Sequence, residues 1–252
     1  MNKLKKIKEI RTNLNDGGVS IGSWMQIPNS SISEIMGGAG YDWVAIDLEH
    51  GTFSNHQLPD IFRALELGDT LPLVRLAEGV SKDCKHALDA GAGGVIVPMV
   101  ESSSQLEVVR DACRWPPAGV RGVGFSRANL FGKNFVEYGE EAQAPLLVAM
   151  IENVLALKSL GKILAVDGLD AVLIGPYDLS ASMGLTGQFD HPEFHAAIRE
   201  IQVLSRENNV ACGIHVVDAD EKMLFKRINE GYRFLAYSID SVMLRRVVSR
   251  PH

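Results

Sequence analysis

The chain has 252 residues, of which 46% are apolar and 22% charged, the composition of an ordinary globular protein. Its formal net charge of -6 argues against nucleic acid or an anionic membrane as the main partner, and no apolar run approaches the roughly 20 residues that a membrane helix needs. A basic N-terminus without an apolar signal core, and three scattered cysteines, indicate the cytoplasm and argue against a disulfide framework.

Short apolar runs alternate with amphipathic stretches along the chain. After a first helix that ends near Gly17, the pattern predicts eight strands and a helix after each of them. The expected strands are 19–24, 43–47, 71–75, 94–99, 146–151, 171–174, 210–215 and 232–236. The expected helices are 30–36, 56–67, 81–90, 102–114, 154–164, 193–208, 218–229 and 239–248.

Eight strand–helix units in 252 residues predict one α/β domain, over residues 1–252, folded as a closed (β/α)8 (TIM) barrel. A doubly wound open sheet is the alternative. It normally uses fewer strands and often carries a glycine-rich phosphate turn, and neither GxGxxG at the first strand–helix turn nor GxxxxGK[ST] anywhere occurs here. The barrel is therefore the better prediction.

One long segment, 115–144, interrupts the alternation and is rich in glycine and proline. Loops of this length inside a compact domain tend to be functional or disordered, and the aromatic residues of this one favour an ordered loop. We interpret it as a loop that covers the site and contacts the substrate. Arg121 and Arg127 are candidates for substrate contacts, although a role in bracing the loop is slightly favoured.

Active-site groups of a (β/α)8 barrel lie at the carboxyl ends of its strands. Glu152 and Asp178 follow consecutive predicted strands. Since neighbouring strands lie about 4.8 Å apart, these carboxylates can meet around one divalent cation that keeps positions open for water and substrate, the usual manner of Mg²⁺. Alternatively, each carboxylate caps a helix or pairs with an arginine.

Two further strand ends carry charged side chains. Arg75 is a natural clamp for a carboxylate, with a structural ion pair to Asp47 or Glu49 as the alternative. His50 lies three residues after Asp47, which could fix the tautomer of its ring, unless the histidine is purely structural. His215 also lies at a strand end and ranks well below His50.

Six segments carry a family resemblance, in the same order and over most of the chain: YDWVAIDLEHG, LVRL, LDAGAGGVIVPMVES, WPPAGVRGVG, MIEN and GLDAVLIGPYDLSASMG. With them the chain resembles the HpcH/HpaI family of class II pyruvate aldolases, within the phosphoenolpyruvate/pyruvate barrel superfamily. The combination of DxEHG, WPPAGVRG and IGPxDLSxxMG is specific, whereas no single piece would suffice.

The resemblance implies roles for individual residues. Glu152 and Asp178 match the metal ligands, Arg75 the arginine that holds pyruvate and its enolate, and His50 with Asp47 the pair associated with proton transfer. Further matches are Asp89, to an aspartate that reaches a neighbouring subunit's active site, and Gly175, Pro176 and Tyr177, to the segment that lines the pyruvate pocket. Met150 stands in the pocket where the family often has glutamine, so the substrate pose can differ.

These expectations combine into a metal-dependent aldolase that uses Mg²⁺, Mn²⁺ or Co²⁺ and reversibly cleaves a 4-hydroxy-2-oxo acid to pyruvate and an aldehyde, through a metal-stabilised enolate. No lysine lies beside the charged strand ends, which argues against a Schiff-base aldolase. The alternatives are a CoA-ester lyase or decarboxylase with the same enolate chemistry, and a non-catalytic metabolite-binding homologue.

The apolar pattern of the last helix, with Val242, Leu244, Val247 and Val248, predicts packing on a partner or closure of its own barrel. The resemblance implies a homohexamer, a trimer of dimers with exchanged C-terminal helices.

Overall fold

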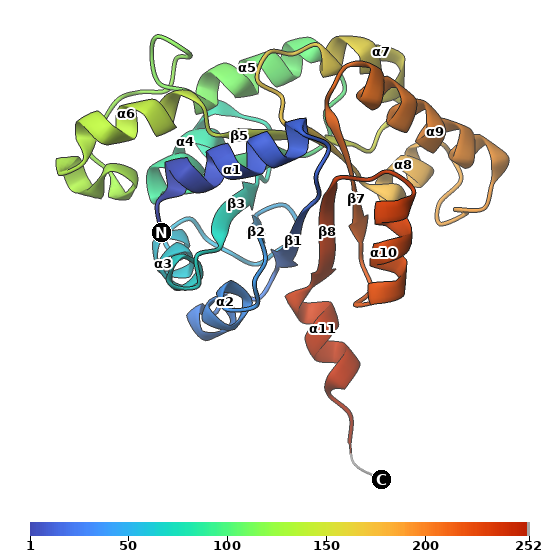
Figure 1. Ribbon diagram of the computed structural model, residues 1–252, viewed down its shortest axis with the longest axis horizontal. Coiled ribbons are helices and arrows are strands. Elements are labelled where there is room, and N and C mark those ends of the chain that lie inside the picture. Colours follow the sequence, from blue (N-terminus) through green and yellow to red (C-terminus); the bar gives the residue numbers. More distant parts are fainter. Residues whose placement is uncertain (251–252) are drawn as a thin grey trace.

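The computed structural model describes residues 1–250 as a closed barrel of eight parallel strands that follow one another in sequence order (Figure 1). The strands are β1 (Ser20–Met25), β2 (Trp43–Asp47), β3 (Leu71–Arg75), β4 (Gly94–Val97), β5 (Leu146–Ile151), β6 (Ala171–Ile174), β7 (Ala211–Val216) and β8 (Phe234–Ile239). Because β8 pairs in parallel with β1, the sheet has no open edge. The predicted (β/α)8 fold is confirmed.

Helices surround this barrel (Figure 1). They are α1 (Lys3–Asn15), α2 (Ser30–Gly37), α3 (Leu58–Leu67), α4 (Ser81–Ala90), α5 (Ser103–Cys113), α6 (Phe135–Gln143), α7 (Val154–Leu164), α8 (Pro176–Ser182), α9 (Pro192–Glu207), α10 (Glu221–Asn229) and α11 (Asp240–Val247), with a 3-10 helix η1 at Arg127–Gly132. None of those within residues 1–250 is long and apolar enough to cross a membrane. The sequence did not predict η1, α6 or α8.

Side chains of each strand alternate between the barrel interior and the surrounding helices. In β2, Trp43 and Ala45 belong to the inner cluster, whereas Val44 and Ile46 pack towards the helices. The indole of Trp43 stacks on the ring of Phe234, with centroids 4.4 Å apart. This alternation fixes which residues past each strand end face the barrel axis.

Helix α1 closes the amino-terminal end of the barrel. Its Ile7, Ile10 and Leu14 are buried in the inner cluster. Arg11 Nε lies 2.6 Å from Oδ1 of Asp170, the residue before β6. The carboxyl ends of the strands therefore form the accessible mouth.

Candidate active site

Asp47 is the last residue of β2, where the alternation directs it into the barrel, and it is fully buried. Arg75 holds its carboxylate with two hydrogen bonds, Nε to Oδ1 over 2.8 Å and Nη2 to Oδ2 over 2.6 Å. The side-chain amide of Gln26 and the backbone N–H groups of Glu49 and His50 donate to the same carboxylate. Although burial opposes ionisation, the contacts with Arg75 and these other donors lower the pKa of Asp47.

Arg75 ends β3 directly beside Asp47, because the two residues are register partners in the sheet. Its Nη1 also lies 2.8 Å from Glu49 Oε2, so the ion pair that the sequence offered as the alternative role of Arg75 forms with both carboxylates. Its guanidinium lies over the ring of Trp24, 5.3 Å from the centroid. Of the five N–H groups of a guanidinium, these carboxylate contacts use three, which leaves two for a ligand.

His50 is exposed at the start of the loop after β2. Within residues 1–250 its one hydrogen bond to Asp47 runs from its backbone N–H to Oδ1, over 3.1 Å. The imidazole does not share in it. The structure thus brings Asp47 to Arg75 and leaves His50 exposed, so the expected carboxylate–imidazole pair is not formed among the described residues.

Glu152 follows β5 and is 1% exposed. Its Oε1 accepts a hydrogen bond of 2.6 Å from the backbone N–H of Met99, whose left-handed φ of 48° is uncommon for a non-glycine residue. Its Oε2 is buried without a hydrogen-bond partner among the described residues. Burial, with added repulsion from Glu49 and Asp178, raises the pKa of Glu152 to about 7.

Asp178 lies in the first turn of α8, which begins one residue after Gly175. Ile151 and Ile174 are register partners, so Glu152 and Gly175 stand side by side where β5 and β6 end. The fit is close, because a Cβ added to Gly175 would lie 2.5 Å from Glu152 Oε2 and 3.1 Å from Glu152 Cβ. Asp178 itself is exposed.

The arrangement favours a cation. Burial raises the pKa of the half-buried Glu49, and the charges of Asp47 and Asp178 add to this shift. The same two kinds of effect, burial and neighbouring carboxylates, raise the pKa of Glu152. Glu152 Oε2, which has no hydrogen-bond partner within residues 1–250, fits the oxygen ligands that hard divalent cations prefer, as does the carboxylate of Asp178. Within residues 1–250, no group of three or more His, Cys, Asp or Glu side chains is placed to hold a metal ion.

Met150 is buried on the inner side of β5, two residues before Glu152. Its Cε lies 3.4 Å from the position of a Cβ on Gly175. Pro176 and Tyr177 open α8 and border a cavity of about 590 Å³ that extends between α9 and α10. The predicted pocket residues therefore gather around the β5–β6 strand ends.

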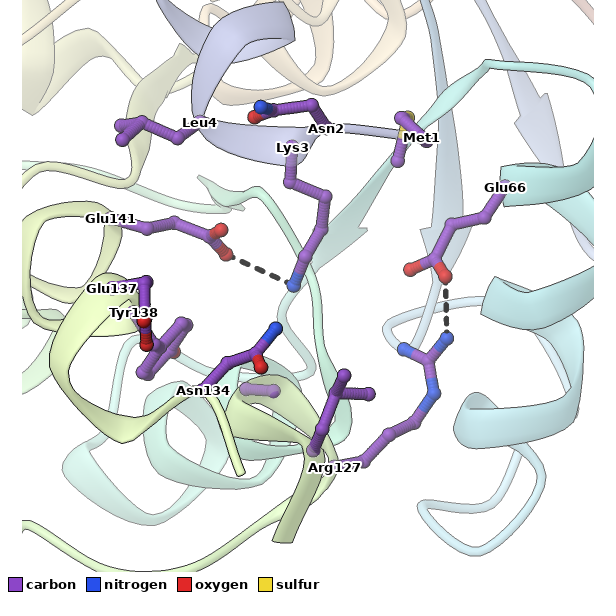
Figure 2. A pocket seen from close by; sticks show the side chains of 12 residues that line it. Met1, Asn2, Lys3, Leu4, Glu66, Arg127, Asn134, Glu137, Tyr138 and Glu141 are labelled. Carbon is purple, nitrogen blue, oxygen red and sulfur yellow. Dashed lines mark hydrogen bonds and ion pairs between the residues drawn. The ribbon is translucent and has the colours of Figure 1, made fainter. Parts of the chain in front are cut away.

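Segment 115–144 does not reach this mouth. It connects α5 to β5, so both of its ends lie at the amino-terminal end of the barrel. Figure 2 shows Arg127 of η1 paired with Glu66 of α3 near the start of α1, where the two side chains line a pocket of about 410 Å³. The expected cover over the site is therefore corrected, because an α-to-β connection lies opposite to the carboxyl ends of the strands.

Both arginines of this segment brace it. Arg127 also donates from Nη1 to the backbone carbonyl of Ala90. Arg121 is 3% exposed, donates from Nη2 to the hydroxyl of Tyr138 over 2.8 Å and lies over the ring of Trp115. Asp89 stands nearby on the last turn of α4, away from the carboxyl end of its own barrel.

Sequence reasoning missed three contributors to the site. Gln26, Trp24 and the backbone N–H of Met99 all contact the charged groups. For Gln26 a signal existed, since a polar residue at an inward position just past a strand belongs to the mouth of the barrel. No sequence pattern marks the left-handed backbone of Met99.

Known proteins are similar to this chain in sequence. A sequence model of the family described as HpcH/HpaI aldolase/citrate lyase matches residues 20–246. A hydroxypyruvate/pyruvate aldolase of Roseobacter denitrificans is 38% identical over 241 residues, 94% of this chain and 93% of the relative. A 4-hydroxy-2-oxo-heptane-1,7-dioate aldolase of Escherichia coli is 36% identical over 235 residues, 92% of this chain and 89% of the relative.

Solved structures share its fold. An HpcH/HpaI aldolase/citrate lyase family protein from Burkholderia cenocepacia superposes with a TM-score of 0.88 at 29% identity, covering 94% of this chain and 95% of that one. The citrate lyase β subunit of M. tuberculosis, complexed with oxaloacetate and magnesium, reaches 0.60 at 18% identity, over 95% of this chain and all of that one. The second likeness concerns the fold alone.

Proposed function

This chain belongs to the HpcH/HpaI aldolase/citrate lyase family, and on that premise we propose that it is a class II pyruvate aldolase that reversibly cleaves a 4-hydroxy-2-oxo acid to pyruvate and an aldehyde. The observation that carries the proposal is the buried Glu152 Oε2, which no group of the described chain hydrogen-bonds, near Asp178 and at the same mouth as Arg75. A site rich in carboxylates with one guanidinium suits a cation together with an anionic 2-oxo acid.

Glu152 and Asp178 would hold the divalent cation, Mg²⁺, Mn²⁺ or Co²⁺. When bound, such a cation supplies a Lewis acid that stabilises negative charge developing on the keto oxygen of the substrate. Glu152 suits this role because the Met99 N–H fixes its Oε1, while its Oε2 accepts no hydrogen bond from residues 1–250. The small Gly175 leaves room for that oxygen.

Arg75 binds the carboxylate of the 2-oxo acid with the two N–H groups that its ion pairs leave free. Asp47 and Glu49 hold the guanidinium in a fixed orientation, so the side chain of Arg75 loses little conformational entropy when the substrate binds. The backbone from Gly175 to Tyr177 and the side chain of Met150 form the wall beside the keto group.

His50 is the proposed proton acceptor. In cleavage it takes the proton of the 4-hydroxyl group, the C3–C4 bond breaks, and C4 becomes the aldehyde carbon. The electron pair of the broken bond passes to C3, which gives the pyruvate enolate, and protonation of C3 completes pyruvate. Because His50 is exposed and not tied to Asp47, its ring is free to turn towards the substrate.

We further infer a homo-oligomer, a hexamer built as a trimer of dimers. Asp89 stands at the far end of α4 from its own site, which supports a role in a neighbouring subunit's site. Helix α11 projects away from the barrel (Figure 1), with Leu244 and Val247 exposed. Free, buried cysteines suit a reducing cytoplasm as the compartment.

The experiment compares Glu152→Gln and Asp178→Asn with the wild type. Each variant keeps the shape of its side chain but removes one negative charge. We expect weaker Mn²⁺ binding in calorimetry and a fall in pyruvate release of at least about a hundredfold, over a panel of 4-hydroxy-2-oxo acids with Mg²⁺, Mn²⁺ and Co²⁺.

Glu200→Gln, at an exposed position of α9, is the matched control and should leave both measurements unchanged. Retention of full pyruvate release in Glu152→Gln and after chelation would show the mechanism to be wrong. Cleavage of acyl-CoA esters without pyruvate release would assign the site to a different enolate reaction.

A further inference from the structure

Gln26 contributes no step to the chemistry above, yet its side chain connects the substrate-binding arginine to helix α11. It directly follows Met25, the last residue of β1, at a position that alternation directs into the barrel. Its Nε2 donates to Asp47 Oδ2 over 2.9 Å, and its Oε1 accepts from Ser241 Oγ over 3.2 Å.

The chemistry of the partners fixes the direction of both bonds. An ionised carboxylate can only accept, so the NH₂ group of Gln26 must face Asp47 and its carbonyl must face the hydroxyl of Ser241. Oδ2 of Asp47 has two side-chain donors, Gln26 Nε2 and Arg75 Nη2. The amide of Gln26 therefore donates to the same carboxylate oxygen that accepts a hydrogen bond from Nη2 of Arg75.

The backbone of Gln26 is held from the same helix. Asp240, the first residue of α11, is 5% exposed and accepts hydrogen bonds from the N–H groups of Gln26 and Ile27, over 2.9 and 3.0 Å. It also accepts from the N–H of Ser241 over 2.7 Å. The start of α11 and the end of β1 thus form one hydrogen-bonded unit.

We propose that Gln26 is a positioning residue for the pyruvate half of the substrate, and that Ser241 holds it in place. This rests on the proposed function, in which Arg75 binds the 2-oxo acid. Without the amide, Oδ2 loses one of two donors, and the carboxylate with its guanidinium can turn away from the orientation that meets the substrate. The aldehyde half, which Arg75 does not hold, is unaffected.

The test is Gln26→Leu, which keeps a similar side-chain size and removes both polar groups. Kinetics are measured in the synthetic direction, with pyruvate and the aldehyde varied separately. We expect the KM for pyruvate to rise about tenfold, the effect of losing a hydrogen bond to a charged group, while kcat and the KM for the aldehyde change by less than about twofold. Gln202→Leu on α9, whose amide donates to the Glu230 carbonyl, is the matched control.

Ser241→Ala separates positioning from general loss of structure. It should raise the KM for pyruvate by about threefold in the wild type and have no effect in the Gln26→Leu background, since the hydroxyl acts only through the amide. A purely structural role would give additive effects and equal changes in both KM values, and either result overturns the proposal.

Pyruvate binding to the Mg²⁺-loaded wild type and Gln26→Leu, measured by calorimetry, keeps the two proposals distinguishable. If the wild type turns over and the variant binds pyruvate equally well, the role of Gln26 is refuted and the aldolase stands. If the wild type shows no aldol turnover but the variant binds pyruvate about tenfold more weakly, the positioning role stands and the proposed reaction fails.

Discussion

The surroundings of His215 in the barrel set both the tautomer and the pKa of its ring. Its ring stacks on the indole of Trp24, with centroids 5.1 Å apart, and its Nε2 lies 3.2 Å from the backbone carbonyl oxygen of Ser238. Since that carbonyl only accepts, Nε2 carries the proton. Burial, assisted by the positive charge of Arg75, lowers the pKa of His215 to about 4.

This shift makes the stability of the fold depend on pH. The folded pKa of about 4 lies below the ordinary value of 6.5, so the unfolded chain binds the proton more readily. The contribution to the free energy of unfolding is fully present above pH 6.5 and is lost as pH falls towards 4. We expect a loss on the order of 3 kcal/mol, since each unit of pKa difference corresponds to about 1.4 kcal/mol.

Urea unfolding of wild type and His215→Phe across this pH range measures the effect. The phenyl ring keeps the stacking on Trp24 but cannot titrate. The free energy of unfolding of the wild type, relative to that of His215→Phe, should therefore fall as pH falls. A difference that stays constant with pH would contradict the assignment to His215.

At the residue scale, the sequence predicted which side chains gather at the mouth, but it offered the ion pair of Arg75 with Asp47 or Glu49 only as an alternative. Position past an apolar strand was enough to select Asp47, Arg75 and Glu152, because the expense of burying charge leaves few other places for them. The partner of Asp47 depends on sheet register, which sets Arg75 beside it. A spacing of three residues suggested the His50 ring instead, but its backbone N–H makes the contact.

The turn from β6 into α8 shows how an element builds the site. Gly175 precedes Pro176 at the first position of α8, where its fixed φ suits a helix start, and Asp178 follows in the first turn. The φ of Gly175 is -94°, so an alanine backbone is unstrained there. Glycine is required at position 175 only because a larger side chain would collide with Glu152.

Gly175→Ala should therefore damage the site more than the fold. The added methyl group would push Glu152 Oε2, whereas Oε1 is held by Met99, so the carboxylate must turn. We expect Mn²⁺ affinity and pyruvate release to fall by at least about tenfold, with a loss of stability of about 1–3 kcal/mol from overpacking. Gly161→Ala in α7 is the matched control and should be neutral or stabilising, because an added Cβ there would meet no other part of the described chain within 4 Å beyond its own helix turn.

Calorimetry and thermal unfolding of both variants check this. Unchanged Mn²⁺ affinity in Gly175→Ala would mean that Glu152 is not confined by the turn.

The eight strands and the helix after each of them followed from periodicity, within three residues at each boundary. The sequence did not predict α8, because GPYD resembles the end of a strand rather than a helix of 7 residues. Segment 115–144 was misplaced for a different reason. Composition identified an ordered loop, but only its position between a helix and the next strand decides at which end of a barrel it lies.

At the scale of the whole molecule, the barrel closes on itself but its last helix does not return to it. Helix α11 begins beside Gln26 and then leaves the barrel (Figure 1), with 50% of Leu244, 76% of Val247 and 67% of Val248 exposed. Single exposed apolar residues are common on monomers. A run of them on a projecting helix instead favours burial against a second copy, where each large side chain contributes about 1.5–3 kcal/mol.

Leu244→Glu combined with Val247→Glu should therefore break the assembly, because two charged side chains would have to be desolvated in the interface. We expect light scattering after size exclusion to find an oligomer for the wild type and a smaller species for the double variant. Val203→Glu, at an exposed site of α9, is the control for the added charge.

The double variant should keep Mn²⁺ binding, since Glu152 and Asp178 belong to one barrel. It should lose pyruvate release if Asp89 acts in a neighbouring site. A wild type that is monomeric and fully active would contradict both the assembly and the role of Asp89.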